Sequence, residues 1–317
     1  MKPITPMLVA LALWGCGAQV DFKQGVPTQE MVSVNTIPQK GTGQMGAGQG
    51  QQALLGDPSD SVALTRGATA AVNGATLWIL GSLKAVTDHP ATSVQGEKAV
   101  WGPFTPELSP TTWKLTVARS GGRSFNYMLE GKQKSQPDTA YQTVLSGTHE
   151  ATGVVGYGSG NFRIDWQSAA AVGGQTGQTA SDAEVKYSHT SASAPTTVDV
   201  EFQAIQSGSS TPTTYATYHY KSTPNVGGEF SFGTDIVAWW DPSSPTDHWS
   251  IKSRWQTNGA GRADATLTGP NLSTPATQNE CWDQNFASQY MYNSADSSKR
   301  WGSASSCVYA NAEYAQP

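Results

Sequence analysis

The sequence predicts a mainly β protein whose central feature is one large antiparallel meander over residues 112–269. Runs of about five to ten residues in this region alternate apolar and polar side chains, the pattern of strands with one buried face. Clusters of Gly, Ser, Thr, Pro and Asn separate the runs and are too short for crossover helices, so antiparallel pairing is expected. Only 14% of the residues are charged, which agrees with a polar, uncharged surface of strands and turns.

Residues 1–15 have the features of an export signal, because one positive charge precedes an apolar run too short to span a bilayer. The run ends in Leu13-Trp14-Gly15-Cys16, which resembles the lipobox of bacterial lipoproteins, although Trp14 is bulkier than the usual residue. The resemblance implies that Cys16 is acylated, becomes the mature N-terminus and anchors a β-rich cell-envelope protein to the membrane. The alternative is an ordinary signal peptide cut nearby, with Cys16 in the discarded segment.

The residue after the cysteine indicates whether the lipoprotein stays at the inner membrane or moves to the outer membrane. Gly17 stands where an aspartate would favour retention at the inner membrane. By resemblance to the sorting rules of bacterial lipoproteins, the protein is therefore expected at the outer membrane, on its periplasmic face or at the cell surface.

The other two cysteines are expected to pair. If Cys16 carries lipid, Cys281 and Cys307 remain in an oxidising compartment, and we predict a disulfide between them. The competing hypothesis is a metal site or a reactive thiol. It has less support because neither cysteine belongs to a CxxC motif or lies beside a histidine.

Residues 16–57 are predicted to form a flexible tether. They include the Gly/Gln-rich run 41–52, which has almost nothing to bury. A coil of this length would hold the folded part, a single domain over residues 58–317, clear of the bilayer surface.

The domain is expected to begin with a helix within residues 58–90. Ser59 or Asp60 can cap its start, and its apolar residues cover more than one face, so burial against one face of the sheet is expected. Asn73-Gly74 is a candidate break, and His89-Pro90 ends the pattern. Residues 101–106 are read as an irregular connector into the first strand.

Ten strands are predicted in the meander. They cover residues 112–118, 124–132, 141–149, 161–169, 183–189, 197–205, 214–221, 229–237, 249–257 and 262–268. Phe162, Ile164 and Trp166 would face the core from one of these strands. Their neighbours Arg163 and Asp165 belong to a charged face of mixed sign, which indicates a solvated outer surface.

A strongly curved sheet or half-open barrel around the helix accommodates these elements, and a two-sheet sandwich is the alternative. Residues 270–317 are predicted to form a disulfide-stapled cap. Its expected elements are a short helix near 282–292 and a last strand at 308–314.

No motif indicates catalysis, a cofactor or a metal. The chain lacks HExxH, GxxxxGK[ST], GxSxG and paired CxxC patterns, and its 5 histidines have no ligand spacing. The net charge of -5 and the lack of a Lys/Arg cluster disfavour a nucleic-acid partner.

Aromatic residues are the candidates for a binding surface, because exposed rings can stack on sugars or fill partner pockets. Core packing is the alternative for each of them. The candidates are Trp239, Trp240, Tyr218, Tyr220, Trp282 and Trp301.

Three functional hypotheses follow. The first is a lipid-anchored envelope protein with a binding or structural role toward a protein, glycan or lipid partner. The second is a carrier that holds a hydrophobic ligand under the helix. The third is a hydrolase whose residues, such as Asp165, Glu201 and His219, gather only in three dimensions.

Overall fold

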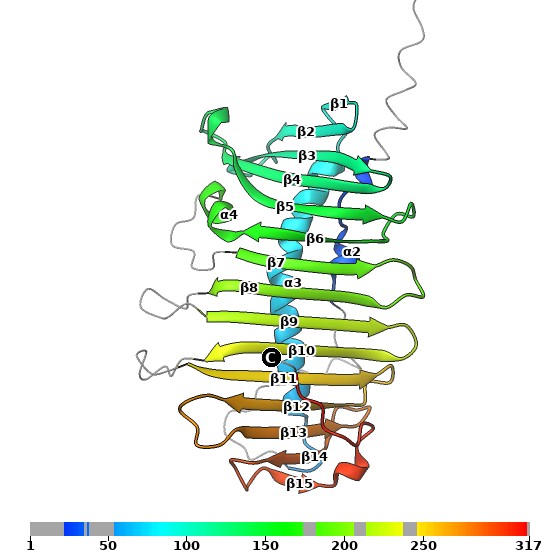
Figure 1. The fold of residues 1–317 in the computed structure, drawn as a ribbon, viewed down its shortest axis with the longest axis vertical. Helices are drawn as coiled ribbons and strands as arrows, with labels where there is room; N and C mark the ends of the chain where they lie inside the picture. Colours follow the sequence, from blue (N-terminus) through cyan, green and yellow to red (C-terminus); the bar gives the residue numbers. More distant parts are fainter. Residues whose placement is uncertain are drawn as a thin grey trace, which may run out of the picture.

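The computed structural model describes residues 22–34, 37, 54–173, 182–205, 214–236 and 246–315. These residues form one sheet of 15 strands in which every strand pairs with its neighbours in the chain, so spatial order equals sequence order (Figure 1). The pairs are antiparallel throughout. The predicted meander is confirmed.

The strands are β1 Ser93–Gln95, β2 Lys98–Phe104, β3 Thr111–Gly121, β4 Ser124–Gln133, β5 Gln142–Ala151, β6 Gly158–Asp165, β7 Asp182–His189, β8 Thr196–Ile205, β9 Thr214–Thr223, β10 Gly227–Ile236, β11 Asp247–Gln256, β12 Gly261–Thr268, β13 Ala276–Trp282, β14 Ser288–Asn293 and β15 Arg300–Gly302. The helices are α2 Gln29–Val32, α3 Asp60–Thr87 and α4 Trp166–Val172, with 3-10 turns η1 Asp138–Ala140 and η2 Ala304–Ser306.

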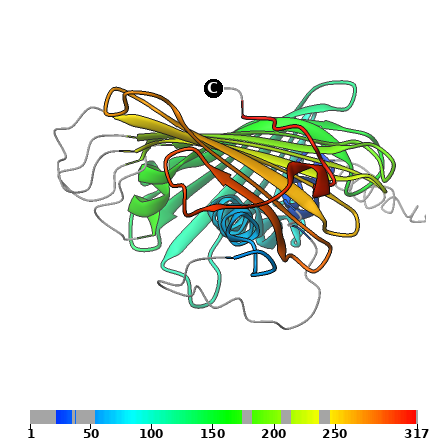
Figure 2. The same cartoon turned by 90° about the horizontal axis from the view of Figure 1, so that it is seen from below.

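The sheet is curved, and helix α3 lies along its concave side, across the strands (Figures 1 and 2). The sheet does not close, because β1 and β15 are its two ends. This arrangement confirms the predicted curved sheet around one N-terminal helix and excludes the two-sheet sandwich for the described residues.

Helix α3 begins and ends within the predicted segment. The Ser59 hydroxyl accepts a hydrogen bond from the Val62 N–H at 3.3 Å, the expected N-cap. The candidate break at Asn73-Gly74 does not interrupt the helix. Instead, the Asn73 side chain accepts from the Val34 N–H at 3.0 Å and donates to the Val34 carbonyl at 2.9 Å. Asn73 therefore fastens the N-terminal segment to the helix.

The core lies between α3 and the concave face of the sheet, which we call the inner face. Ile79, Leu80 and Leu83 of the helix are at most 1% exposed. The alternating pattern of the longer strands turns one residue in two toward this core, as Leu115 and Val200 illustrate. The predicted inward orientation of Phe162 and Ile164 is confirmed.

Polar side chains also anchor the helix to the sheet. The Thr65 hydroxyl lies 2.7 Å from the Ser253 hydroxyl. Glu280 of β13 is 1% exposed, and its Oε2 accepts from the Ser61 N–H at 2.9 Å in the first turn of α3. Burial raises the pKa of Glu280, and hydrogen bonds with Ser61 oppose that shift. The carboxyl group thus satisfies a helix-terminal donor inside the core.

The predicted tether over residues 16–57 is wrong for its middle part. Six apolar side chains of this segment are buried: Phe22, Val26, Met31, Val32, Val34 and Ile37. Their spacing has no simple helical or strand period, so periodicity alone did not reveal that they pack. The Gly/Gln-rich run 41–52 lies outside the described residues.

Four local predictions are also wrong. Residues 282–292 form no helix, because Cys281 pairs with Tyr290 across β13 and β14. Residues 308–314 are not a strand, and 101–106 belong largely to β2.

Trp166 begins α4 rather than continuing β6, because Asp165 accepts from the Ser168 N–H at 2.8 Å and caps a helix there. Strand pairing and a local cap override the apolar patterns in these segments.

The convex face of the sheet, the outer face, is covered at β11–β13 by the C-terminal segment 303–315. Asp264 is 0% exposed and accepts from Arg262 Nε at 2.8 Å, Asn279 Nδ2 at 2.7 Å and Arg254 Nη2 at 3.3 Å. Its other contact is the Glu313 N–H at 3.0 Å. This cluster fastens the segment to the sheet.

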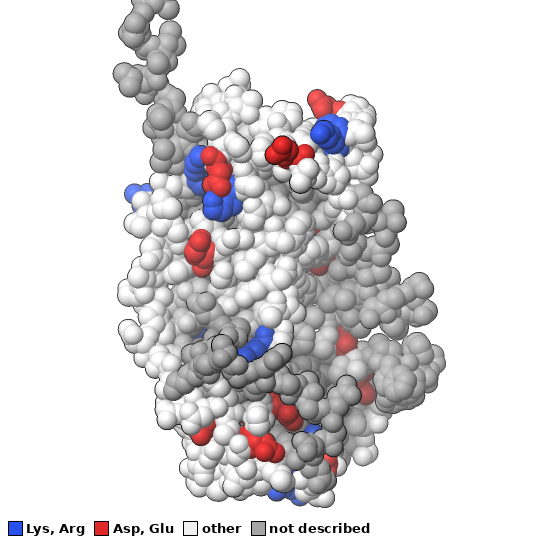
Figure 3. Space-filling model, turned by 180° about the vertical axis from the view of Figure 1, so that it is seen from behind, with Lys and Arg blue, Asp and Glu red and all other residues white. Residues whose placement is uncertain are grey.

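Charged side chains are sparse on the helix side of the molecule (Figure 3). The two faces of the sheet are therefore unlike each other. The helix side buries the apolar core, whereas the outer face carries the ionic residues of β6–β13, as the alternating pattern predicts.

The predicted disulfide is confirmed: Cys281 and Cys307 are bonded, with a sequence separation of 26. It ties the C-terminal segment to β13.

Replacing Cys281 and Cys307 together by serine is expected to lower the free energy of unfolding by about 2–3 kcal/mol, because the closed loop no longer restricts the unfolded chain. Guanidinium denaturation of the oxidised protein and the double variant measures this. Equal midpoints for the two proteins would contradict a stabilising role.

Candidate functional site

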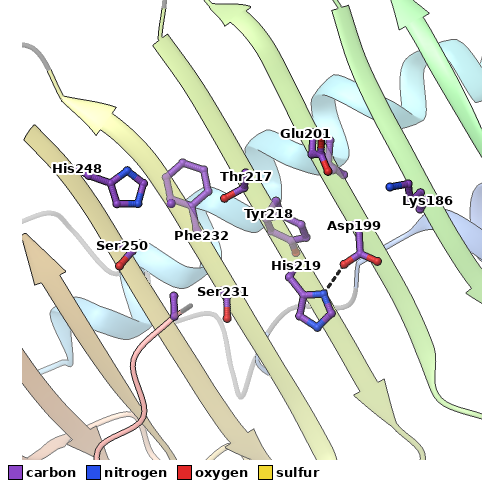
Figure 4. A pocket seen from close by; sticks show the side chains of 13 residues that line it. Lys186, Asp199, Glu201, Thr217, Tyr218, His219, Ser231, Phe232, His248 and Ser250 are labelled. Carbon is purple, nitrogen blue, oxygen red and sulfur yellow. Dashed lines mark hydrogen bonds and ion pairs between the residues drawn. The ribbon is translucent and has the colours of Figure 1, made fainter. Parts of the chain in front are cut away.

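The candidate site is a shallow hollow on the outer face, at strands β8–β11. The register places Lys186, Asp199, His219 and Ser231 side by side in one row across β7–β10. A second row, one residue pair along, contains Glu201, Thr217, Gly233 and Ser250. Figure 4 shows these side chains gathered over the strands. The hollow has a volume of about 310 Å³.

Gly233 forms part of the floor of the hollow. A Cβ atom there would lie 3.2 Å from Thr217 Oγ1 and 3.3 Å from His248 Nε2. Both distances are shorter than an ordinary van der Waals contact, so Thr217 and His248 pack closely around this position and a larger residue would displace them.

His219 and Asp199 form the most polar contact of the site. His219 Nδ1 lies within hydrogen-bond distance of Asp199 Oδ1, across β8 and β9 (Figure 4). The hydrogen bond with Asp199 raises the pKa of His219 above its ordinary value, and partial burial opposes that shift. The pair presents an imidazole and a carboxylate together at the surface.

A second pair of the same kind borders the hollow. His248 Nδ1 lies 3.1 Å from Asp235 Oδ1, and both side chains are about one-third exposed, at 39% and 33%. The Ser250 hydroxyl lies 2.9 Å from that of Thr266. Hydroxyl, imidazole and carboxylate groups thus alternate across the hollow within a few ångströms of one another.

The hollow is suited to a neutral or cationic ligand. Asp199 and Glu201 supply two carboxylates, and Lys186 supplies one ammonium group. Within the residues that the structure describes, no three His, Cys, Asp or Glu side chains lie close enough together to hold a metal ion.

The residues that the hydrolase hypothesis grouped together are only partly adjacent. Glu201 and His219 both line the hollow, whereas Asp165 is engaged in capping α4 at the end of β6. Strands β8–β11 are paired on both sides. Their N–H groups are used in the ladders, so the central strands offer no pair of free N–H groups to stabilise an oxyanion.

The aromatic candidates divide into three groups. Tyr218, Tyr220 and Trp282 are at most 2% exposed and belong to the core, so they form no exposed binding surface. Trp301 is half-buried, and its Nε1 donates to Ser288 Oγ at 3.2 Å. Trp239 and Trp240 lie outside the described residues, as does Cys16. The sequence did not separate the core rings from surface rings, because both occur in apolar runs.

One aromatic cluster was not singled out from the sequence. Trp78, Trp113 and Trp166 line an apolar hollow of about 380 Å³ between α3, β3 and α4. The rings of Trp78 and Trp166 lie 5.7 Å apart. No pattern in the sequence marks this cluster, because the three rings meet only through the packing of α3 against β3 and α4.

Replacing Asp199 by asparagine is expected to lower the pKa of His219 toward its ordinary value of about 6.5, because the hydrogen bond to a carboxylate is lost. The contribution of this pair to stability is fully present below the unfolded-state pKa and is lost as the pH rises through the raised folded-state pKa. NMR titration of the histidine ring signals measures the shift. His248 in the same sample is the control, and an unchanged His219 titration would contradict the assignment.

Comparisons with protein-family models, with curated proteins and with solved structures found no match for this chain. Among the helices that the structure describes, none combines the length and the apolarity needed to cross a bilayer.

Proposed function

We propose that this protein is a lipid-anchored cell-envelope protein that binds a glycan on the outer face of its sheet. The location rests on the lipobox at Cys16. The binding role is carried by one observation: the polar hollow floored by Gly233, with the Asp199–His219 pair at its side.

The chemistry of the hollow favours a polyhydroxylated ligand. Each sugar hydroxyl both donates and accepts, so it is matched by neighbouring carboxylate, imidazole and hydroxyl groups. Asp199 and Glu201 of β8 and Ser231 of β10 present such groups. A protein partner is less well matched, because the centre of a protein interface is depleted of charge and enriched in aromatic rings.

The carrier hypothesis has less support from the packing. The concave side of the sheet, where a hydrophobic ligand would lie, is filled by α3. Ile79, Leu80 and Leu83 are in contact with the core and almost completely buried. Admitting a ligand would require the helix to leave its apolar surroundings, at a cost that grows with the apolar area exposed.

The binding proposal is tested by calorimetric titration of the mature protein with soluble oligosaccharides prepared from bacterial envelope polysaccharide. Gly233→Val is expected to weaken binding about tenfold or more, because the added side chain would displace Thr217 and His248, which line the hollow. Thr197→Val is the matched control, since this residue precedes Asp199 on the same face of β8 but does not line the hollow. Equal affinities of the Gly233 variant and the wild type, or no binding of any fraction, would refute the proposal.

Glycoside hydrolysis is a second candidate, favoured by the two carboxylates of Asp199 and Glu201. They are two residues apart on one strand face, so their Cα atoms are roughly 7 Å apart. Glycosidases use two carboxyl groups that flank the glycosidic bond. The assay measures the release of reducing ends from the same oligosaccharides. Release by the wild type that is abolished in Glu201→Gln would show that the protein hydrolyses the glycan and does not only bind it. We expect no release, because the Asp199 carboxylate is already hydrogen-bonded to His219.

The anchor is tested by intact-mass analysis of protein isolated from the bacterial membrane. The expected mass is that of residues 16–317 plus acyl groups, less two hydrogens for the disulfide. Cys16→Ser should lose the acyl mass and leave the membrane fraction. An unmodified Cys16 in the wild type, or cleavage beyond it, would refute the location.

A further inference from the structure

We infer that the loop between β5 and β6 docks onto the bilayer beside the lipid anchor, with Val154 and Val155 inserted among the lipid headgroups. The inference rests on the proposed acylation of Cys16 and deepens it, since it states which part of the fold meets the membrane. We refer to residues 152–157 as the β5–β6 tip.

The β5–β6 tip presents two adjacent apolar side chains to solvent. Val154 is 60% exposed and Val155 is 74% exposed. The tip has a defined conformation: the Tyr157 N–H donates to the Val154 carbonyl at 3.2 Å, and the Val154 N–H donates to Thr152 Oγ1 at 3.3 Å. Gly153, with φ 88°, permits the turn. The two valines are therefore held outward together.

The N-terminal segment lies directly beside the tip. Lys23, Gln24 and Val26 line the same apolar hollow as Val154 and Val155, with a volume of about 210 Å³. Phe22 is fixed in the core, where its ring packs edge-on against Phe125 at 6.2 Å. The chain is therefore secured to the fold next to the tip.

The length of chain between Phe22 and the anchor limits how far the tip can be from the bilayer. Six peptide steps separate Cys16 from Phe22, which span at most about 22 Å when fully extended. A coil as long as the tether predicted from the sequence would have left the domain free of the surface. Burial of residues 22–34 removes most of that freedom and keeps this end of the molecule at the membrane.

The charges around the tip are compatible with headgroups. Lys23 lines the hollow beside it, and Arg123 donates to the Thr152 carbonyl at the base of the tip. The nearby carboxylate of Glu150 accepts from the Ser124 hydroxyl at 2.7 Å. Two cations thus flank the apolar tip, as in surfaces that lie at a membrane interface.

Docking by this tip leaves the proposed glycan site open. The hollow at β8–β11 is centred about three strands from β6, roughly 15 Å along the sheet. It also lies on the outer face, so the anchor and the binding surface occupy different parts of the molecule.

The test uses the acylated protein in vesicles of phosphatidylethanolamine and phosphatidylglycerol. Val155→Cys is labelled with an environment-sensitive fluorophore, which is possible because Cys281 and Cys307 are bonded to each other. Val226→Cys is the matched control: Val226 is 62% exposed in the β9–β10 hairpin, farther along the sheet. Quenching by nitroxide lipids is expected to be at least about threefold stronger at 155 than at 226.

Equal quenching at the two positions, in protein whose mass confirms acylation, would overturn the docking. Adding Val154→Asp to the 155-labelled protein should reduce its quenching to the level at 226, and unchanged quenching would also overturn it. A missing acyl group in the mass spectrum would instead refute the proposed anchor, so the two failures are distinguishable.

Discussion

Asp264→Ala is expected to lower the free energy of unfolding by about 4 kcal/mol, the largest effect of a single substitution that the structure indicates. Asp264 is completely buried between two arginines, and Arg262 and Asn279 donate to it at 2.8 and 2.7 Å. Removing the carboxylate leaves Arg262, itself 2% exposed, without its charged partner. Urea denaturation followed by tryptophan fluorescence measures the difference.

Asp88→Ala is the matched control for Asp264. Asp88 accepts from Lys84 at 2.7 Å, but both side chains are more than half exposed, at 61% and 65%. Its removal is expected to leave the free energy of unfolding almost unchanged, because solvent screens an exposed ion pair. Similar losses for the two variants would show that the buried cluster holds no special role and that the C-terminal segment is fastened by other contacts.

Leu80→Ala is expected to lower the free energy of unfolding by about 3–4 kcal/mol. Leu80 is 1% exposed between α3 and the inner face, so truncation leaves a cavity that rigid strands on one side cannot fill. The same denaturation experiment measures the loss. Because the helix crosses the whole sheet, its packing stabilises strands that are far apart in sequence.

Leu64→Ala on the same helix is the control for Leu80. Leu64 is 40% exposed, so its truncation is expected to cost less than about 1 kcal/mol. Equal effects at the two positions would contradict the orientation of α3. A loss at Leu80 below about 1 kcal/mol would indicate that the concave side is loosely packed, which is what the carrier hypothesis requires.

The proposed functions are linked by the position of the sites along one sheet. In the proposed arrangement, the β5–β6 tip would lie at the membrane, and the Gly233 hollow would lie beyond it on the outer face. A glycan ligand anchored elsewhere in the envelope would then be held at a set distance from the bilayer. The acylation of Cys16 and the identity of the glycan are the two premises that the mass and calorimetric measurements decide.

Local patterns in the sequence determined the elements of this fold. The alternation of side chains predicted the strands from β3 to β12, because a strand with one buried face must alternate. The limits of α3 followed from the cap at Ser59 and from His89-Pro90, since both act within one helical turn. The pairing of Cys281 with Cys307 was predicted because these two cysteines remain once Cys16 is assigned to the lipid anchor. The lipobox at Cys16 remains a prediction.

Only the tertiary structure decided which side chains meet. The burial of Phe22, the pairing of β13 with β14 and the core positions of Tyr218 and Trp282 depend on segments distant in sequence that cover them. The lining of the hollow also depends on register, which places Thr217 and Ser250 opposite Gly233 on neighbouring strands. The periodicity of a strand predicts which side of the strand each residue faces. It does not predict which other residues lie on that side, because these come from segments that are distant in sequence.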